Sequence, residues 1–261
     1  MSVRSLATSN LKNNQRKYGS MSGKFRGEDV EITYLVIAGG GGGGTVVYSS
    51  GGGAGGYRNS STGELSGGNN PAESPYQIQL GKEYLVRIGA GGAPASFGRP
   101  GDVSFFGDIM SVGGGGGGSG DTNYASPGGR GGSGGGGSNS SAGGDAIFRQ
   151  GFAGGSSGYK DSAFGGGAGS AGTTSTAGSG LASSITGSSV TRAAGRTSGN
   201  GTANTGQGAG PGSTGGSGVV IIRFSNLINI SIGAGLTSST TTSGNDTVVT
   251  FTAGQDTVVF S

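Results

Sequence analysis

The chain of 261 residues contains no cysteine, no histidine and no tryptophan, and only 11% of its residues are charged. Without cysteine, neither a disulfide framework nor a thiolate metal site can form. Without histidine, the chain lacks the commonest general base and metal ligand, so Ser-His-Asp and Cys-His catalytic arrangements are excluded. We therefore expect a protein that is not an enzyme, carries no cofactor or metal, and acts by binding or assembly.

Other signals of catalysis and of membrane insertion are also missing. No phosphate-binding loop of the pattern G-x-x-x-x-G-K-[ST] occurs, and scattered G-x-G-x-x-G matches arise by chance in a chain with 67 glycines. The 13 acidic residues show no grouping of the kind that glycoside hydrolysis needs. No apolar run approaches the ~20 residues that span a bilayer, and the first residues lack the apolar core of a secretory signal. We expect synthesis in a cytoplasm and use in an assembly.

Positive charge is concentrated at the N-terminus. Residues 1–27 contain six basic residues and no acidic one, whereas the rest of the chain has ten basic and 13 acidic residues. A basic arm on a nearly neutral body favours an acidic docking partner. Basic and aromatic residues are not interleaved in the body, so we expect no nucleic-acid partner. Residues 1–27 are predicted to be an anchor arm, with a solvated terminus as the simpler alternative. The anchoring candidates are Leu6, Leu11, Lys12, Arg16, Lys17 and Tyr18.

Glycine makes up about a quarter of the chain, against an ordinary share of ~7%. Apolar residues run directly into glycine runs at residues 39–44 and 113–118, and a third glycine-rich stretch leads back into the apolar residues 219–224. A flexible linker is one interpretation. The other is polyproline-II-like geometry, which has three residues per turn and leaves backbone groups free to bond to neighbours. Because apolar segments bracket the glycine-rich region, we predict that residues 113–118 form a rod in a packed lattice of such helices.

Apolar alternation predicts the remaining strands. Residues 30–37 begin as a half-exposed strand and end as a buried one, and residues 76–80 and 84–88 read as a hairpin that turns at Gly81. A second pair, residues 102–106 and 108–112, is hinged at Gly107. The predicted fold is all-β: a β-sandwich-like frame that carries a bundle of polyglycine-II helices, with almost no α-helix.

The chain divides into three parts on these criteria. Residues 1–27 are the anchor arm, residues 28–225 a β-framed glycine-rich domain, and residues 226–261 a C-terminal extension of β-branched strands. The extension either continues the frame or forms a separate β-module that is contributed to a neighbouring subunit. The apolar end at residues 258–260 is expected to be a sheet strand rather than a docking peptide.

Five segments occur in an order that resembles a known family: YLVIAGGGGGG at residues 34–44, GGGAGGYR at 51–58, YLVRIGAGG at 84–92, GLASSITGSSV at 180–190 and GSGVVIIRF at 216–224. Together they resemble the glycine-rich domain of tailed-phage virion proteins, notably of marine and cyanobacterial phages. In architecture and composition the chain is also similar to phage fibre-tip adhesins with polyglycine-II sandwiches and to receptor tyrosine kinase glycine-rich domains.

The phage resemblance implies a function. It implies a phage tail fibre or fibre-tip adhesin, made in the host cytoplasm and placed on the exterior of the virion, that binds the host cell surface non-covalently. The alternative is a structural fibre or connector on the capsid or baseplate that binds no receptor. The implied partners are other virion proteins through the N-terminal arm, a host surface glycan or outer-membrane protein, and further copies of the chain, with a homotrimer expected by family analogy.

Sparse aromatic and cationic residues in the glycine-rich region are the receptor-binding candidates. Aromatic faces and the guanidinium fork of arginine suit the recognition of sugars and acidic groups. The competing interpretation is that these side chains fill gaps between glycine helices. The candidates are Tyr124, Arg130, Phe152, Tyr159 and Phe164.

Overall fold

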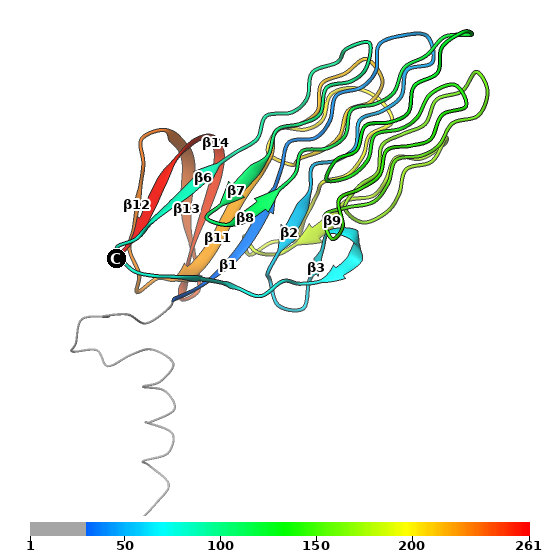
Figure 1. Ribbon diagram of the computed structural model, residues 1–261. Coiled ribbons are helices and arrows are strands. Elements are labelled where there is room, and N and C mark those ends of the chain that lie inside the picture. Colours follow the sequence, from blue (N-terminus) through cyan, green and yellow to red (C-terminus); the bar gives the residue numbers. More distant parts are fainter. Residues whose placement is uncertain (1–29) are drawn as a thin grey trace, which may run out of the picture.

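The computed structural model describes residues 30–261. They form an elongated molecule in which a sheet-rich part continues into a body of glycine-rich rods that run side by side (Figure 1). We call the first part the β-frame and the second the glycine lattice; the lattice comprises the rods within residues 38–56, 89–102, 113–180 and 193–218. The anchoring candidates of the N-terminal arm lie outside the described residues. No helix within residues 30–261 is long and apolar enough to cross a membrane.

The predicted all-β class is confirmed, because the described chain contains strands and one short 3₁₀ turn, Gly67–Asn69. The strands are β1 (Val30–Ile37), β2 (Tyr57–Asn59), β3 (Leu65–Ser66), β4 (Asn70–Pro71), β5 (Tyr76–Ile78), β6 (Glu83–Arg87), β7 (Ser104–Phe106), β8 (Ile109–Ser111), β9 (Leu181–Ser183), β10 (Val190–Arg192), β11 (Val219–Ser225), β12 (Ile230–Ile232), β13 (Leu236–Ser243) and β14 (Asp246–Phe260).

The main sheet of the β-frame is antiparallel, and its strands follow the order β2-β1-β11-β14-β6-β7-β8. The long strand β14 serves two parts of this sheet. Its first half pairs with β11 and β13, and its second half pairs with β6 and β12. Gly254, with φ of 95°, lies between the two halves and allows a backbone conformation that other residues rarely adopt.

Strand β1 is buried on both faces, which explains why its sequence ends in a continuous apolar run. Ile32, Tyr34 and Val36 face the main core of the β-frame. Leu35 and Ile37 face a second cluster, which the β9–β10 region covers. Edge-to-face aromatic contacts fill the main core, with ring centroids 5.3 Å apart between Phe224 and Phe260 and 6.1 Å apart between Tyr84 and Phe260.

The predicted hairpin of residues 76–88 is wrong. The turn exists, since Gly81 has a φ of 79°, but β5 pairs with β1 and β6 pairs with β14. The place beside β6 is taken by the second half of β14, which comes from the far end of the chain. The other predicted pair is confirmed: β7 and β8 form a hairpin across Gly107.

The C-terminal segment extends the frame within the same chain. β14 lies between β11 and β6 in the sheet. Val258 and Phe260 are fully buried, so the apolar C-terminal residues form a core strand, as expected. Four side chains of β14 belong to the main core, namely Val249, Phe251, Val258 and Phe260.

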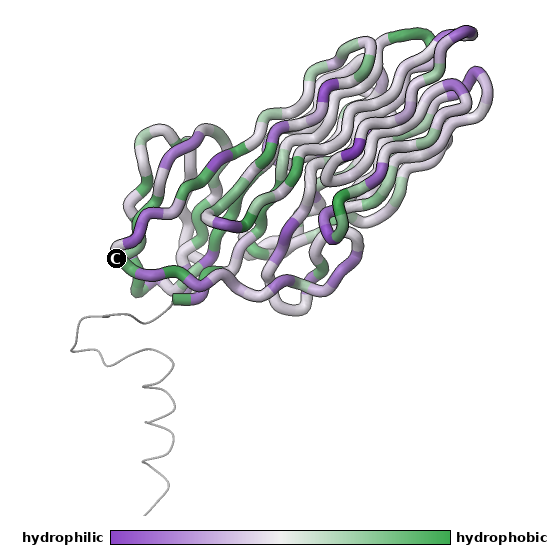
Figure 2. The backbone as a smooth tube through the Cα atoms, viewed as in Figure 1, coloured by the Kyte–Doolittle hydropathy of each residue, from purple (hydrophilic) through white to green (hydrophobic). Residues whose placement is uncertain are grey.

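The glycine lattice is held together by backbone hydrogen bonds rather than by an apolar core. Figure 2 shows green, apolar stretches concentrated in the β-frame, whereas the lattice rods are mostly pale. In the rod of residues 113–118, Gly114 and Gly117 donate to the carbonyl oxygens of Gly39 and Gly42, at 2.8 and 2.9 Å. Hydrogen bonds from the rod of residues 113–118 to its other neighbours repeat at the same spacing of three residues. The bonded residues in those neighbouring rods are Ser133 and Gly136, Gly98 and Gly101, Ser50 and Gly53, and Gly129 and Gly132.

This repeat of three residues is the period of a polyglycine-II helix. Close approach between the rods requires glycine: a Cβ added at Gly115 would stand 1.9 Å from the carbonyl oxygen of Gly129. The prediction that residues 113–118 form a rod in a packed lattice is confirmed, and the linker interpretation is wrong.

Candidate functional site at the tip of the glycine lattice

The turns between the rods gather at the end of the molecule opposite the β-frame (Figure 1). We call four of them, residues 45–49, 121–125, 139–141 and 156–161, the tip loops. Backbone hydrogen bonds connect them: the amide of Tyr48 donates to Gly120, the residue just before the loop of residues 121–125, at 2.9 Å, and that of Ser140 donates to Gly158 at 2.8 Å. The loops therefore form one continuous surface on a rigid support.

Asn139 locks two of the tip loops together. Its side-chain nitrogen donates to the carbonyl oxygens of Asp121 and Tyr124, and its side-chain oxygen accepts from the amide of Lys160 at 2.9 Å. Asn139 has a φ of 46° and is only 6% exposed. Asparagine tolerates this left-handed conformation better than most residues, so one buried side chain fixes the relative positions of both loops.

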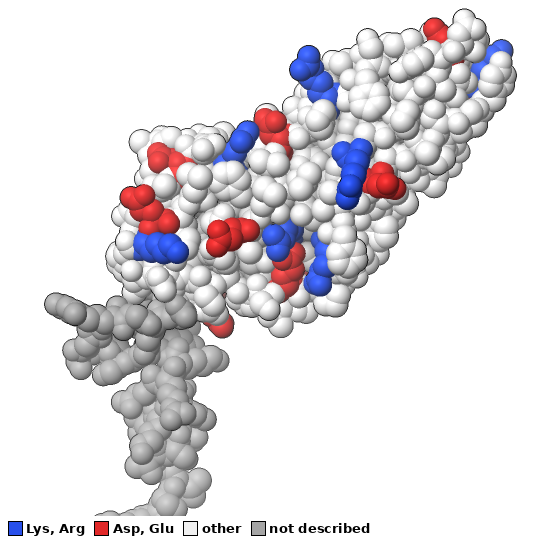
Figure 3. Space-filling view, in the orientation of Figure 1, with Lys and Arg blue, Asp and Glu red and all other residues white. Residues whose placement is uncertain are grey.

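The locked loops display aromatic side chains. Tyr124 is 64% exposed and Tyr159 is 69% exposed, and the ammonium group of Lys160 lies 5.2 Å from the ring centroid of Tyr159. Figure 3 shows few charges on the lattice surface, with side chains of both signs at its outer end. Exposed tyrosine rings on an ordered backbone provide large contact areas with little conformational entropy to lose. The arrangement suits non-covalent recognition.

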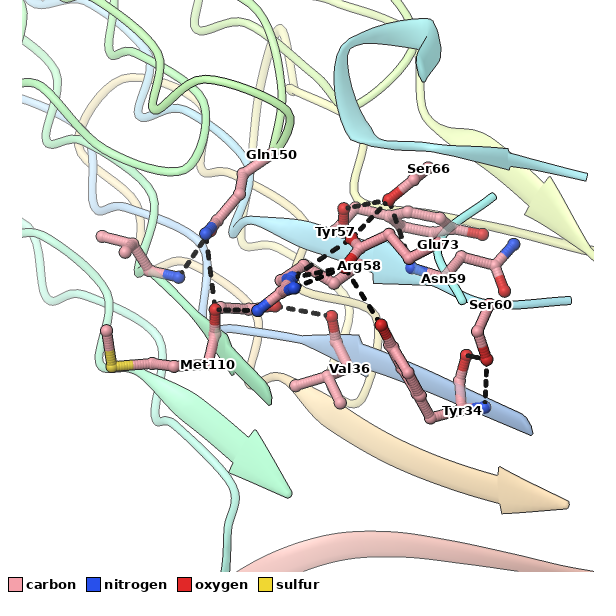
Figure 4. A network of polar contacts seen from close by, with 12 residues as sticks. Tyr34, Val36, Tyr57, Arg58, Asn59, Ser60, Ser66, Glu73, Met110 and Gln150 are labelled. Carbon is pink, nitrogen blue, oxygen red and sulfur yellow. Dashed lines mark hydrogen bonds and ion pairs between the residues drawn. The ribbon is translucent and has the colours of Figure 1, made fainter. Parts of the chain in front are cut away.

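A polar network at the other end of the lattice joins it to the β-frame (Figure 4). The carboxylate of Glu73 accepts hydrogen bonds from Arg58, from the hydroxyl of Tyr34 at 3.0 Å and from the hydroxyl of Ser66 at 3.0 Å. Burial alone would raise the pKa of Glu73, but these hydrogen bonds outweigh it and hold the pKa below its usual value. Burial, and then the charge of Glu73, raise the pKa of Tyr34.

Gln150 extends this network into the lattice. Its side-chain oxygen accepts from the amide of Val112 at 2.8 Å, and its nitrogen donates to the carbonyl oxygen of Met110 at 3.3 Å. Arg58 donates to the same carbonyl oxygen at 3.4 Å. The rod of residues 113–118 begins at this point, so the network fixes where the lattice leaves the sheet.

The family model of the glycine-rich domain matches residues 19–225. The chain belongs to the glycine-rich domain family. Comparison of the chain with curated proteins and with solved structures gave no match. The matched segment ends with β11. Strands β12, β13 and β14 lie outside it, although they belong to the same β-frame.

The glycine-rich domain does not gather all five receptor-binding candidates in one place. Tyr124 and Tyr159 lie in the tip loops that Asn139 joins. The other three lie in the rods of the lattice: Arg130 is exposed, and Phe152 and Phe164 are half-buried. The amides of Phe152 and Phe164 donate to Gly167 and Thr173 within the lattice. All five remain predictions as contact residues, and the geometry favours the two tyrosines.

Sequence reasoning missed Asn139 and Gln150. Asn139 stands in a run of polar residues with no distinguishing neighbour, and its importance depends on which loops the lattice brings together. No group of three or more side chains suited to binding a metal ion occurs in the described part of the glycine-rich domain.

Proposed function

We propose that this protein is a structural component of a phage particle, a tail fibre or fibre-tip adhesin on the virion exterior that binds the host cell surface. The observation that carries the proposal is the pair of exposed tyrosines, Tyr124 and Tyr159, locked by Asn139 at the outer end of a rigid lattice. The resemblance of the sequence to glycine-rich domains of tailed-phage virion proteins supplies the biological context.

The two ends of the molecule suit this role. The described chain starts at Val30, at the end of the β-frame that points away from the tip loops (Figure 1). Val30, which follows the N-terminal segment in the sequence, thus lies opposite the proposed receptor-binding surface. In the proposal, the arm docks onto other virion proteins, copies of the chain associate as a homotrimer, and the tip contacts a host glycan or outer-membrane protein.

The proposed mechanism is non-covalent. The rings of Tyr124 and Tyr159 stack on apolar faces of the receptor, and Lys160 supplies positive charge beside one of them. Hydrogen bonds to the peptide backbone keep the loops ordered before binding, which lowers the entropy cost of association. No chemical step is required.

The test uses purified protein on a panel of bacterial cells. The double variant Tyr124→Ala, Tyr159→Ala removes both rings, and Phe148→Ala is the matched control because Phe148 is 83% exposed and lies outside the tip loops. We expect saturable binding to at least one strain, a tenfold or larger loss in the double variant, and no change in the control.

The alternative, a fibre or connector without receptor binding, predicts a different pattern. Equal binding by the double variant and by the control would contradict the proposed contact surface. Immunogold labelling of intact particles adds the second readout: label on tail fibres supports the proposal, and label confined to the capsid contradicts it.

A further inference from the structure

Arg192 is a half-buried cation without a partner group. Atom Nη1 of its guanidinium is buried and has no hydrogen-bond partner, and no carboxylate among residues 30–261 forms an ion pair with it. Burial lowers the pKa of the group, and the interaction with the nearby hydroxyl of Tyr57, which forms no hydrogen bond with it, offsets this only in part. Because burying an unpaired charge costs free energy, a half-buried arginine in this state needs an explanation outside its hydrogen bonds and ion pairs within residues 30–261.

The residue lines an open hollow of about 200 Å³ at the base of the glycine lattice. Its other lining residues are Thr191, Ala193, Ala194, Thr202, Thr205 and Gln207. None of them is acidic, and the sequence from residue 162 to residue 245 contains no aspartate or glutamate. The hollow thus combines positive charge with polar side chains and has no negative charge in its own wall.

Gln207 supplies a second donor. Its side-chain oxygen is occupied, since it accepts from Nη1 of Arg196 at 2.9 Å and from the amide of Thr202 at 3.0 Å. The side-chain nitrogen of Gln207 donates to no other group within residues 30–261, so it is free to donate to a ligand. Arg196, which does not line the hollow itself, adds positive charge through its bond to Gln207, so both arginines favour an anion in the hollow.

The backbone on both sides of the hollow is held in an unusual conformation. Ala193 is fully buried with a φ of 53°, and Asn204 has a φ of 61°. The amide of Ala193 donates to the carbonyl oxygen of Thr205 at 2.8 Å, which joins the two walls. Left-handed conformations of non-glycine residues cost energy and persist where the surrounding structure fixes them. The shape of the hollow is therefore built into the fold.

We propose that this hollow binds an oxyanion, with the guanidinium of Arg192 as the ionic partner and the side-chain amide of Gln207 as the second donor. Carboxylate, sulfate and phosphate groups share this chemistry, and guanidinium pairs with each of them through parallel hydrogen bonds. A hollow of this size lies below the ~300 Å³ at which sites for drug-sized ligands begin, so it fits one charged group or a single acidic sugar. The site is separate from the tip loops and does not depend on receptor binding there.

The experiment titrates the purified full chain with sodium acetate, glucuronate, sulfate and phosphate at constant ionic strength, with sodium chloride as the reference salt. The readouts are the thermal unfolding midpoint and the NMR signals of the Arg192 and Gln207 side chains. The variants are Arg192→Met, which keeps the apolar stem, and Arg99→Met as a control on an exposed arginine of the lattice that has no assigned role.

We expect saturable shifts of both side-chain signals with at least one oxyanion, and a higher unfolding midpoint than in chloride. In Arg192→Met the affinity falls at least tenfold, while Arg99→Met matches the wild type. Comparing the affinities for acetate and glucuronate with those for sulfate and phosphate shows whether the hollow prefers a carboxylate or a tetrahedral anion. Without oxyanion, Arg192→Met unfolds at the same or a higher temperature than the wild type, because it removes an unpaired buried charge.

Two results would overturn the proposal. One is the absence of saturable shifts with all four anions. The other is a lower unfolding temperature of Arg192→Met in chloride together with an unchanged response to oxyanions, which would assign Arg192 a purely structural role.

Discussion

The substitution Gly115→Ala tests whether the lattice is as tightly packed as its geometry indicates. The new Cβ would stand 1.9 Å from the carbonyl oxygen of Gly129, whereas Cβ contacts in proteins essentially never fall below 3.0 Å. The rod of residues 113–118 must then move by about 1 Å, which stretches a hydrogen bond of 2.8 Å beyond the bonding range. Two bonds connect this rod to its neighbour, from Gly129 to Gly116 and from Gly132 to Gly113.

Each buried backbone group that loses its partner costs about 1–3 kcal/mol. Loss of both bonds leaves two amides and two carbonyl groups without partners and thus lowers the free energy of unfolding by about 4–12 kcal/mol, most of the 5–15 kcal/mol that is typical of a folded protein. The matched control is Gly158→Ala, because the nearest atom to its added Cβ is 4.0 Å away.

Urea unfolding and amide hydrogen exchange measure the effect. Gly158→Ala should stay within about 0.5 kcal/mol of the wild type, whereas Gly115→Ala should lose exchange protection throughout residues 113–118. Equal unfolding midpoints for the two variants would refute the close-packed lattice.

Three further predictions concern the β-frame. Because the pKa of Glu73 lies below its usual value of 4.5, its contribution to stability is present above that pH and is lost as the pH falls through the lower native pKa. Replacing Glu73 by Gln should therefore cost about 2 kcal/mol at pH 7, with the difference from wild type shrinking in acid; a pH-independent difference in urea midpoints would contradict this. Tyr34→Phe should cost about 1 kcal/mol, because it removes a hydrogen bond to Glu73. Tyr57→Phe should be neutral or stabilising, because the buried hydroxyl of Tyr57 has no hydrogen-bond partner in residues 30–261. Thermal unfolding of both variants checks the contrast. Phe260→Ala should cost about 3–5 kcal/mol, and an unchanged midpoint would show that the C-terminal strand is dispensable to the core.

Local patterns in the sequence predicted much of the fold. Successive side chains of a strand point to opposite faces, so the continuous apolar run at the end of β1 indicated that both of its faces are buried. The glycine runs indicated polyglycine-II rods because that geometry has no internal hydrogen bonds and so leaves the backbone groups free to bond to neighbouring rods. The partner of β6 was beyond such reasoning: alternation shows that a strand has an inner face, but not that β14, over 150 residues away, pairs with it.

The tip could be predicted only in part. Residue type was enough to select Tyr124 and Tyr159, because large aromatics are conspicuous among glycine and serine. Their proximity depends on the order in which the rods pack, and on Asn139 reaching from one turn to two others. Nothing in the local sequence around Asn139 carries that information. The same holds for the hollow at Arg192, whose walls come from two separate segments.

The three-residue repeat of the lattice sets a rule for how such a molecule can change in length. Inserting three residues into each rod adds one full turn and moves the tip outward by about 9 Å, with every donor still opposite an acceptor. Inserting one or two residues rotates the remainder of the rod and turns donors away from their acceptors. The distance between the β-frame and its displayed loops is therefore adjustable only in whole turns, and the loops at the end can vary in sequence without disturbing that step.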